Sequence, residues 1–380
     1  MESFRATYRV KVAAGDAEAR AEALLLEQTV ELPRPAVRDP FVEKEILGRL
    51  DKITPDPAGG FLISISYPLK TTALDPAHFL TVLFGNSSLQ EDVVLSDVEL
   101  PQALLSMLGG PAFGIRGIRL LTGVEGRPIT CTALKPMGLP PDAIADLART
   151  FATAGIDIIK DDHGLADQPF CPFEARVRAC RASVEDVART TGHRALYVPN
   201  LTGSPEKVFR QLAFAREAGV RAVMLAPMLL GLPFLRELRD GACDVPIIAH
   251  PTFAGALRID PETLLGTLFR VYGADAVIYP HWGGRFSYSA EACRALAGRL
   301  RYPLDAIRPA MPVPAGGIEV DRTEEVVRFY GNDAVLLIGG SLYMAGPALL
   351  ERSRTFVDRV HRAAEGEDAR RRTERDHEAG

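Results

Sequence analysis

The stretch Gly155-Ile-Asp-Ile-Ile-Lys-Asp-Asp-His-Gly-Leu-Ala-Asp-Gln-Pro-Phe170 decides how the fold of this chain is interpreted. A short run rich in isoleucine leads there into Lys160, Asp161, Asp162 and His163. An apolar run that ends in charged residues is typical of a buried strand that delivers side chains to a pocket. Two interpretations stay open on spacing alone. Lys160 is either a structural lysine in a salt bridge, or half of a metal site in which a carboxylated lysine and an aspartate bind a hard cation through oxygen.

A regular alternation of strand-like and amphipathic helical runs surrounds this stretch, beginning at about Ile129. The expected strands are Ile129–Leu134, Asp157–Lys160, Ala195–Pro199, Ala222–Ala226, Pro246–Ala249, Ala276–Tyr279, Ile307–Val313 and Ala334–Ile338. The expected helices between them include Pro141–Ala154, Phe173–Thr190, Ser204–Ala218, Pro261–Tyr272 and Arg322–Phe329. Consecutive βα units of even length predict a (β/α)₈ TIM barrel, and a doubly wound open sheet is the structural alternative.

The residues before the barrel lack this alternation. Thr7–Val12 and Phe61–Tyr67 are predicted to be strands, and Ala17–Gln28 and Pro76–Phe84 are predicted to be helices. Ser96–Met107 and Phe113–Gly123 are expected to form the connection to the barrel. We therefore expect an N-terminal α+β domain at residues 1–113, the barrel at 114–364, and a disordered tail of mixed charge at 365–380.

The composition is that of an ordinary soluble globular protein, with 380 residues, 47% hydrophobic and 24% charged, and a net charge of −5. This mild acidity gives no reason to expect nucleic acid or an anionic membrane as a partner. The five cysteines are scattered and show no CxxC spacing, which favours reduced thiols over disulfides or a zinc site. The first residues lack the apolar core of a signal peptide, and no apolar stretch approaches the roughly 20 residues of a membrane span. We expect a cytoplasmic location.

The reactive groups of such a barrel lie at the C-terminal ends of its strands. The residues at those positions are Lys135, Lys160, Asp162, His163, Asn200, His250, Tyr279, His281, Arg285, Ala315-Gly316-Gly317 and Gly339-Gly340-Ser341. Two glycine pairs after the last two strands favour a phosphate site built from backbone N–H groups. Lys135 and His250 each keep a second interpretation, as a solvated loop lysine and as a hydrogen-bonded core histidine. The loop from His281 to Arg285 is either a mobile lid or a long turn.

These residues resemble a known family, the RuBisCO large-chain superfamily. The resemblance rests on Gly110-Pro-Ala-Phe-Gly-Ile-Arg-Gly-Ile-Arg119, Arg127-Pro128, Lys135-Pro-Met-Gly-Leu139, the Lys160-Asp-Asp-His163 segment with Gln168-Pro-Phe170, Phe84-Gly-Asn86, and the two glycine pairs in matching order. It covers nearly the whole chain. Several departures place the chain among the RuBisCO-like proteins of that superfamily, apart from the carboxylases.

The resemblance implies a metal centre. Lys160 corresponds to the lysine that reacts with CO₂ to give a carbamate, and Asp162 to the metal-binding carboxylate. The third ligand of the family is a glutamate, whereas this chain has His163. Because Mg²⁺ prefers oxygen, the imidazole implies weaker Mg²⁺ binding, another divalent metal, or a histidine that acts as acid or base. We expect a retained divalent site.

The resemblance also implies roles for four further residues. Lys135 corresponds to the lysine that stabilises or protonates the enediolate, and His250 to a histidine that handles protons near the substrate. Glu27 and Asn86 match first-domain residues that reach into the barrel of a partner chain. The family therefore implies a homodimer or larger assembly with shared active sites.

The departures from the family concern the second phosphate of a bisphosphate substrate. Ala315–Gly317 and Gly339–Gly340 preserve one phosphate site, but the groups for the other are missing. Where the family has an arginine after the strand-five histidine, this chain has Pro251. Where the family has a further histidine three residues later, this chain has Ala254. The family's histidine at the end of strand six is also missing, because that strand ends in Tyr279-Pro280. A second dianion would be poorly neutralised there. Met137 replaces a second lysine, and Arg285 is either a substitute for the lysine of the following loop or an anchor for that loop.

We therefore expect a metal-dependent enzyme that forms an enediolate from a monophosphorylated sugar or sugar acid, and no CO₂ fixation. The favoured reaction is decarboxylation, or transcarboxylation with hydrolysis, of a 3-oxo sugar-acid phosphate of the 3-oxo-isoapionate 4-phosphate type, with His250, His281 and Arg285 as partners for the carboxylate. The first alternative is isomerisation or enolisation of a methylthio-ketose phosphate in sulfur salvage, to which the apolar Met137, Phe253 and Trp282 are suited. The second alternative, suggested by His163, is a non-catalytic regulatory protein.

Overall fold

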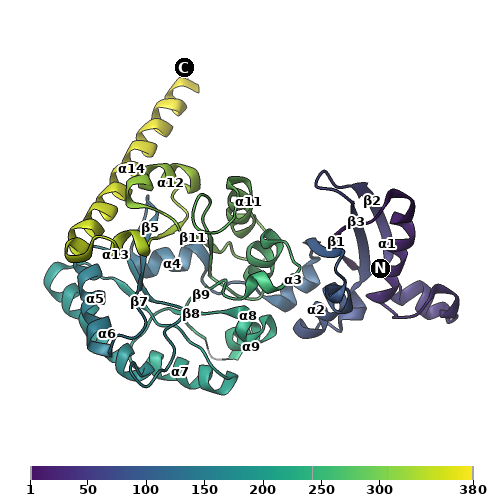
Figure 1. Cartoon of the computed structure of the whole chain (residues 1–380), viewed down its shortest axis with the longest axis horizontal. Coiled ribbons are helices and arrows are strands. Elements are labelled where there is room, and N and C mark those ends of the chain that lie inside the picture. Colours follow the sequence, from purple (N-terminus) through teal and green to yellow (C-terminus); the bar gives the residue numbers. More distant parts are fainter. Residues whose placement is uncertain (1, 242, 306, 379–380) are drawn as a thin grey trace.

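The computed structural model describes residues 2–241, 243–305 and 307–378, with side chains of the last helix described as far as Gly366. Its N-terminal part is an antiparallel sheet in the order β2 (Arg49–Pro55), β3 (Phe61–Pro68), β1 (Ser3–Val10), β4 (Val93–Glu99). Helices α1 (Ala17–Glu27) and α2 (Pro76–Phe84) accompany this sheet. Every second residue of β1 is buried, as expected for a strand with one face on a core. This part lies to one side of the rest of the chain (Figure 1).

The larger part is a barrel of parallel strands, which confirms the predicted fold class. Its strands are β5 (Ile129–Leu134), β6 (Ile158–Asp161), β7 (Leu196–Val198), β8 (Val223–Leu225), β9 (Ile247–Ala249), β10 (Ala276–Pro280), β11 (Met311–Ala315) and β12 (Val335–Leu337). They pair in the order β7-β6-β5-β12-β11-β10-β9-β8. A parallel bridge between Asn200 and Met224 joins the two ends of this order and closes the barrel. Strand β5 coincides with its prediction, and the bounds of the other strands lie within four residues of theirs.

Helices surround the strands (Figure 1). They are α3 (Gln102–Leu108), α4 (Gly114–Thr122), α5 (Pro141–Thr153), α6 (Phe173–Thr191), α7 (Pro205–Glu217), α8 (Pro227–Leu230), α9 (Leu232–Gly241), α10 (Phe269–Val271) after a π-helical segment at Glu262–Leu268, α11 (Ala290–Arg301), α12 (Thr323–Tyr330), α13 (Gly340–Tyr343) and α14 (Leu349–Glu378). Helix α6 shows why they pack, because Phe173, Val177, Cys180, Val184 and Val187 form one buried stripe at helical spacing.

Two apolar clusters fill the barrel. The smaller lies inside the ring of strands and includes Cys131, Ile158, Met224, Ile278 and Val313. The larger lies between the strands and the helices and continues into the N-terminal sheet. Because the interior is packed with side chains, the ring of strands leaves no space for a ligand inside it, and the loops at its C-terminal end are where such barrels bind their ligands.

The two parts of the chain are joined by polar contacts around Asp260. Its carboxylate lies 2.9 Å from Arg9 Nη2 and accepts a hydrogen bond from Ser96 Oγ, also at 2.9 Å. Leu95 of β4 forms a parallel bridge with Ile259 beside this carboxylate. The loop after β9 is therefore tied to the N-terminal sheet.

Three features differ from the sequence predictions. Strand β2 has no predicted counterpart, because Arg49, Asp51 and Lys52 leave an exposed edge strand without apolar alternation. The segment expected as a connection at Ser96–Met107 contains the end of β4 and most of α3. The tail expected to be disordered from Glu365 continues α14 to Glu378. A helix that is already nucleated adds residues at little cost, and this tail is rich in Ala, Arg and Glu.

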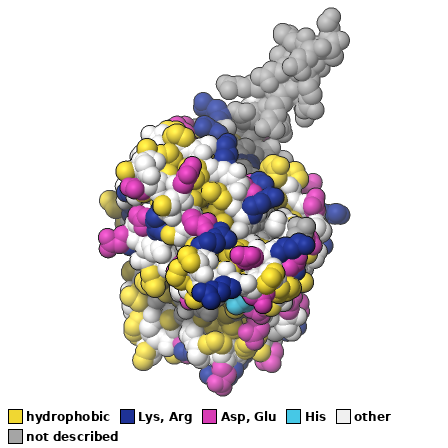
Figure 2. All heavy atoms as spheres, turned by 90° about the vertical axis from the view of Figure 1, so that its right-hand side faces the viewer, with side chains coloured by type: hydrophobic (Ala, Val, Ile, Leu, Met, Phe, Trp, Pro, Cys, Tyr) yellow, Lys and Arg dark blue, Asp and Glu magenta, His cyan; other side chains and the backbone are white. Residues whose placement is uncertain are grey.

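The surface shows no field of one sign on the face that Figure 2 presents. Lysine and arginine side chains alternate there with aspartate and glutamate, among hydrophobic side chains. A basic stripe of the kind that tracks a nucleic-acid backbone is absent from this face. Among the described residues, no helix is both long enough and apolar enough to cross a membrane.

Candidate active site

The structure brings predicted site residues from three strands together at the C-terminal end of the barrel. Lys135 Nζ, after β5, forms an ion pair with Asp162 Oδ1, after β6. His163 Nδ1 lies 3.5 Å from the same oxygen. The rings of His163 and His250 stack with centroids 4.3 Å apart and an interplanar angle of 16°. Charged and imidazole groups separated by up to 115 residues in the sequence thus form one cluster.

Burial and neighbouring charges together set the protonation of this cluster. Desolvation lowers the pKa of Lys160, which is 2% exposed and donates a hydrogen bond to Asp161 O at 2.9 Å. Burial also lowers the pKa of His250 to about 2, with Lys160 and His163 adding to the effect. For Asp162, burial opposes ionisation, but the interactions with His163 and Lys135 outweigh it and hold the pKa well below its usual range. The cluster therefore combines an ionised carboxylate with a neutral imidazole and an amine that loses its proton more readily than usual.

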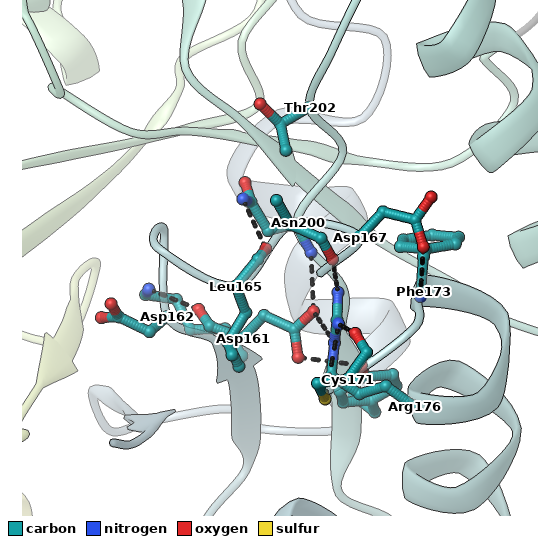
Figure 3. A network of polar contacts seen from close by, with 12 residues as sticks. Asp161, Asp162, Leu165, Asp167, Cys171, Phe173, Arg176, Asn200 and Thr202 are labelled. Carbon is teal, nitrogen blue, oxygen red and sulfur yellow. Dashed lines mark hydrogen bonds and ion pairs between the residues drawn. The ribbon is translucent and has the colours of Figure 1, made fainter. Parts of the chain in front are cut away.

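A buried network lies on the other side of the same strand end (Figure 3). Asp161 is fully buried and points toward Arg176, whereas Asp162 points the other way. The Asp161 carboxylate accepts hydrogen bonds from Arg176 Nε at 3.0 Å, Tyr197 Oη at 2.9 Å and the Asn200 backbone at 3.1 Å. Burial works against the guanidinium charge, but the carboxylate outweighs it and raises the pKa of Arg176. Asp161 is thus structural, with partners for both oxygens.

The network also fixes the loop that carries Asp162 and His163. Arg176 donates to Ala166 O at 2.8 Å and to Cys171 O at 2.9 Å. The Asn200 amide donates to the backbone oxygens of His163 and Leu165, both at 3.0 Å. Asn200, predicted at a strand end, is 3% exposed and supports this loop through these hydrogen bonds from the buried side. The backbone of residues 163–171 is therefore held from the barrel side.

The two glycine loops lie at the same end of the barrel. A Cβ built on Gly339 would lie 3.9 Å from Lys135 Cε, which places the strand-eight loop beside the cluster. A Cβ on Gly317 would lie 2.2 Å from Gly284 Cα, so these loops touch backbone to backbone. In the described part of the chain, the amides of Gly316, Gly317, Gly339 and Gly340 donate to no protein acceptor. Such amides suit an anion. Ala315, the last residue of β11, instead accepts a hydrogen bond from the His281 backbone at 2.7 Å.

The loop that follows β10 directs its side chains differently from the prediction. His281 is 1% exposed, and its Nδ1 lies 3.1 Å from Tyr330 Oη within an aromatic cluster that also contains Trp282. Burial lowers the pKa of His281 to about 4. Arg285 is exposed, with its guanidinium over the Phe286 ring at 5.0 Å. The expectation that His281 faces a substrate carboxylate is not supported by this packing. Arg285 is exposed, and its chain neighbours Gly284 and Phe286 contact the Gly316-Gly317 loop.

Glu27 and Asn86 contact each other and not the barrel. Asn86 Nδ2 donates to Glu27 Oε1 at 3.1 Å near the surface. Within the described residues, neither side chain has a polar contact with Lys135, Asp162 or His250. A single chain therefore leaves this pair outside the cluster.

The donors of the cluster fit a divalent metal only if Lys160 carries a carbamate. No group of three His, Cys, Asp or Glu side chains able to hold a metal ion occurs among the described residues. Asp162 and His163 supply two donors, and Asp161 is committed to Arg176. A carbamate on Lys160 would supply the missing oxygen donor, and a buried amine with a lowered pKa is the nucleophile that CO₂ requires.

Three residues that support the cluster were not identified from the sequence. Tyr343 Oη accepts from the Lys135 backbone at 2.9 Å and donates to Ala133 O at 3.0 Å. Thr252 Oγ1 lies 2.6 Å from His250 Nδ1. Arg176 carried a detectable signal, since it lies three residues after Phe173 within the apolar stripe of α6, where a charge implies a buried partner. Nothing in the local sequence indicates the partner of Tyr343.

Comparisons with known proteins agree with this geometry. Residues 114–276 match the family model described as the ribulose bisphosphate carboxylase large chain, catalytic domain. A ribulose bisphosphate carboxylase-like protein 1 of Rhodopseudomonas palustris is 47% identical over 93% of this chain and 96% of its own length. The crystal structure of a Rubisco-like protein from the same species superposes with a TM-score of 0.88 at 41% identity, over 95% of this chain and 98% of that one.

Two further relatives carry the names of enzymes. A 5-methylthioribulose-1-phosphate isomerase of Rhodospirillum rubrum is 42% identical over 95% of this chain and 97% of its own. A putative 2,3-diketo-5-methylthiopentyl-1-phosphate enolase of Shouchella clausii is 32% identical over 91% and 94%. These names favour the methylthio-ketose alternative over the decarboxylation that the sequence analysis preferred.

Proposed function

This chain belongs to the ribulose bisphosphate carboxylase large-chain family as a RuBisCO-like protein, and from that premise we propose that it isomerises a monophosphorylated methylthio-ketopentose. The relative with the isomerase name supports this reaction more strongly than the enolase does, at 42% against 32% identity. The reaction moves one proton between neighbouring carbons through an enediolate. Its atoms balance without any other reactant.

The observation that carries this proposal is that two of the three expected partners for a substrate carboxylate are unsuited to bind one. The decarboxylase interpretation needed His250, His281 and Arg285 as partners for that group. His281 is buried against Tyr330, and the low pKa of His250 leaves its ring uncharged. Of these three partners, a carboxylate would keep only the exposed Arg285, whereas a thioether needs no cation.

An apolar group does lie at the rim of the cluster. Met137 is 57% exposed, and its Sδ accepts from Gln168 Nε2 at 3.5 Å. The same sulfur would lie 3.9 Å from a Cβ on Gly164, in the loop after Asp162. A polarisable thioether is suited to contact another one. Met137 therefore supports a methylthio substituent. Trp282, expected to serve the same purpose, packs instead against Phe329 and His281.

Different residues of the site bind the phosphate, exchange protons and hold the metal. The free amides of the two glycine loops bind the phosphate, and Arg285 adds a positive charge near the Gly316-Gly317 loop, which its chain neighbours contact. Lys135 and His250 are the two groups able to exchange protons with the substrate. Lys160 as its carbamate, Asp162 and His163 would hold Mg²⁺ or another divalent cation. When bound, that cation would polarise the ketone oxygen of the substrate.

Glu27 and Asn86 complete the site in a homodimer, where they belong to the partner chain. Their separation from the cluster in a single chain supports this assignment. Mixing two inactive variants, Lys160→Met and Asn86→Ala, tests it. Hybrid dimers contain one intact site, so activity should reappear after subunit exchange. Activity that stays absent in proven hybrids would contradict shared sites.

A substrate screen followed by ³¹P and ¹H NMR tests the function itself. The protein is supplied with Mg²⁺ or Mn²⁺, bicarbonate and one of three compounds: 5-methylthioribulose 1-phosphate, 2,3-diketo-5-methylthiopentyl 1-phosphate, or a 3-oxo sugar-acid phosphate. Isomerisation of the first compound, with no loss of carbon, is expected. Turnover of the second alone would establish the enolase, and release of CO₂ from the third would restore the decarboxylase. No turnover of any compound, and no metal binding by calorimetry, would favour the regulatory protein.

A further inference from the structure

A tight turn follows β9 and contains His250. The His250 backbone N–H bonds to Leu225 O at 2.8 Å, which fixes the start of the turn. The Ala254 N–H then bonds to Pro251 O at 2.9 Å. Phe253 has φ of +69° and ψ of 2°, the values of the third position of a type II turn, where glycine is usual. A phenylalanine in this left-handed conformation is strained, so the surrounding contacts must hold the turn in place.

Two hydrogen bonds connect the turn to the His250 ring. The Thr252 backbone N–H donates to His250 Nδ1 at 3.2 Å, and Thr252 Oγ1 lies 2.6 Å from the same nitrogen. A backbone N–H can only donate, so Nδ1 must present its lone pair. The Thr252 hydroxyl is therefore also a donor. A neutral ring with an unprotonated Nδ1 carries its hydrogen on Nε2.

The imidazole of His250 cannot rotate to its flipped orientation without losing hydrogen bonds. A half-turn of the imidazole about its bond to Cβ would place a carbon against Thr252 and break both hydrogen bonds. Stacking on His163, with centroids 4.3 Å apart, restricts the ring from its face. The orientation of His250 is therefore set by one residue on its edge and one on its face.

On the basis of the proposed isomerase, we propose that Thr252 is a positioning residue that holds His250 as the Nε2–H tautomer. His250 then donates a hydrogen bond to a substrate oxygen and does not take up the carbon-bound proton. Lys135, the other group of the cluster placed to exchange a proton with the substrate, is then the residue that handles the carbon-bound proton. The neutral donor stabilises the oxygen on which negative charge develops.

Three substitutions separate the contributions of Thr252. Thr252→Ser keeps both donors, and Thr252→Val removes only the hydroxyl. Thr252→Pro removes the hydroxyl and the N–H together, while proline suits the second position of a type II turn. Thr190→Val is the control, because this exposed helical threonine donates only to backbone oxygens of its own helix. Circular dichroism and thermal unfolding establish that each variant is folded.

The first measurement is the ¹⁵N spectrum of the imidazoles in the free, full-length protein, with the His250 signals identified from a His250→Gln variant. We expect an unprotonated Nδ1 and a protonated Nε2 in the wild type, in Thr252→Ser and in the control. Thr252→Val should shift the tautomer equilibrium partly toward Nδ1–H, and Thr252→Pro further. A wild-type ring with its hydrogen on Nδ1 would overturn the proposal, and so would an unchanged tautomer in Thr252→Pro.

The second measurement is steady-state kinetics on 5-methylthioribulose 1-phosphate. Each lost hydrogen bond should lower kcat about tenfold with KM changed less than about threefold, since the donor acts on charge that develops during reaction. Equal kcat in wild type, Thr252→Val and Thr252→Pro would refute the positioning role. Because the tautomer is measured without substrate, it decides the claim about Thr252 even if this compound is not turned over. Failure of the proposed function is therefore separable from failure of this inference.

Discussion

Two neighbouring aspartates at the end of β6 belong to regions with opposite properties. Asp161 faces a buried network in which Arg176, Tyr197 and Asn200 supply donors to both carboxylate oxygens. Asp162 faces the open end of the barrel, where Lys135 and His163 are its partners. The alternation of side chains along a strand directs one aspartate into the buried network and the other to the open end, where we propose that the chemistry takes place. Substitutions on the two sides should therefore differ in kind: loss of folding on one, loss of turnover on the other.

The largest effect should come from Lys160→Met on the chemical side. The substitution keeps the volume of the side chain and removes the amine that we propose to be carbamylated. We expect kcat/KM to fall on the order of 10³-fold or more. The free energy of unfolding should stay equal or rise, because a buried amine is costly to desolvate. Lys207→Met, on a surface lysine paired with Asp167, is the control. Activity within about tenfold of wild type would contradict the assignment of Lys160.

The opposite result is expected for Arg176→Met in the buried network. Removing the guanidinium leaves the Asp161 carboxylate buried without its cation, which should lower the free energy of unfolding by about 3–5 kcal/mol. Urea unfolding measures this loss. The double variant Asp161→Asn with Arg176→Met should recover part of it, because no buried charge remains. A loss below about 1 kcal/mol would show that the network is not the support described above.

A third prediction concerns how the free energy of unfolding changes with pH in the wild type and in His250→Gln. The pKa of His250 is lowered to about 2, so the unfolded chain takes up a proton below about pH 6.5 while the folded chain does not. Stability from this group is complete above that pH and is lost as the pH falls. Relative to His250→Gln, the wild type should lose about 1.4 kcal/mol per pH unit below about pH 6. Urea unfolding at about pH 7, 6 and 5 tests the slope, and parallel curves for the two proteins would contradict a buried neutral histidine.

The smallest effect on folding should come from Met137→Lys at the rim. Because Met137 is 57% exposed, the free energy of unfolding should change by less than about 0.5 kcal/mol. KM for the methylthio substrate should rise about tenfold, since a hydrated cation replaces an apolar contact. Leu120→Lys, on α4 at 71% exposure, is the matched control and should leave KM unchanged. An unchanged KM in Met137→Lys would remove Met137 from the substrate site.

The barrel could be predicted because its information is local. Each strand is an apolar run and each helix has one apolar face. The residues that follow the strands can therefore be named from the sequence, and the structure places Lys135, Asp162, His163 and His250 among them in one cluster. The N-terminal sheet was predicted less completely. Strand β2 is a charged edge strand, whose pairing with β3 depends on long-range register and leaves no periodic signal.

The direction of each side chain could not be predicted. His281 follows β10 as directly as His250 follows β9, yet it packs against Tyr330 while His250 joins the cluster. The direction of each histidine side chain depends on which residues pack beside its loop, and those residues come from distant segments of the sequence. The preference for decarboxylation rested on the single-phosphate inference and on His250, Arg285 and His281 as partners for a carboxylate, and the packing of His281 against Tyr330 does not support its part in that set.

We propose that the groups on the Asp162 side of β6 transfer a proton within a methylthio-ketose phosphate and keep all of its carbons. The most direct test is ¹H NMR of 5-methylthioribulose 1-phosphate in D₂O with the full-length protein, Mg²⁺ and bicarbonate. We predict an isomeric product that retains its methylthio group and phosphate and acquires deuterium on a carbon of the isomerised pair, unless the proton is transferred without exchange, in which case the isomer alone is formed. An unchanged substrate, together with CO₂ released from a 3-oxo sugar-acid phosphate under the same conditions, would contradict the account.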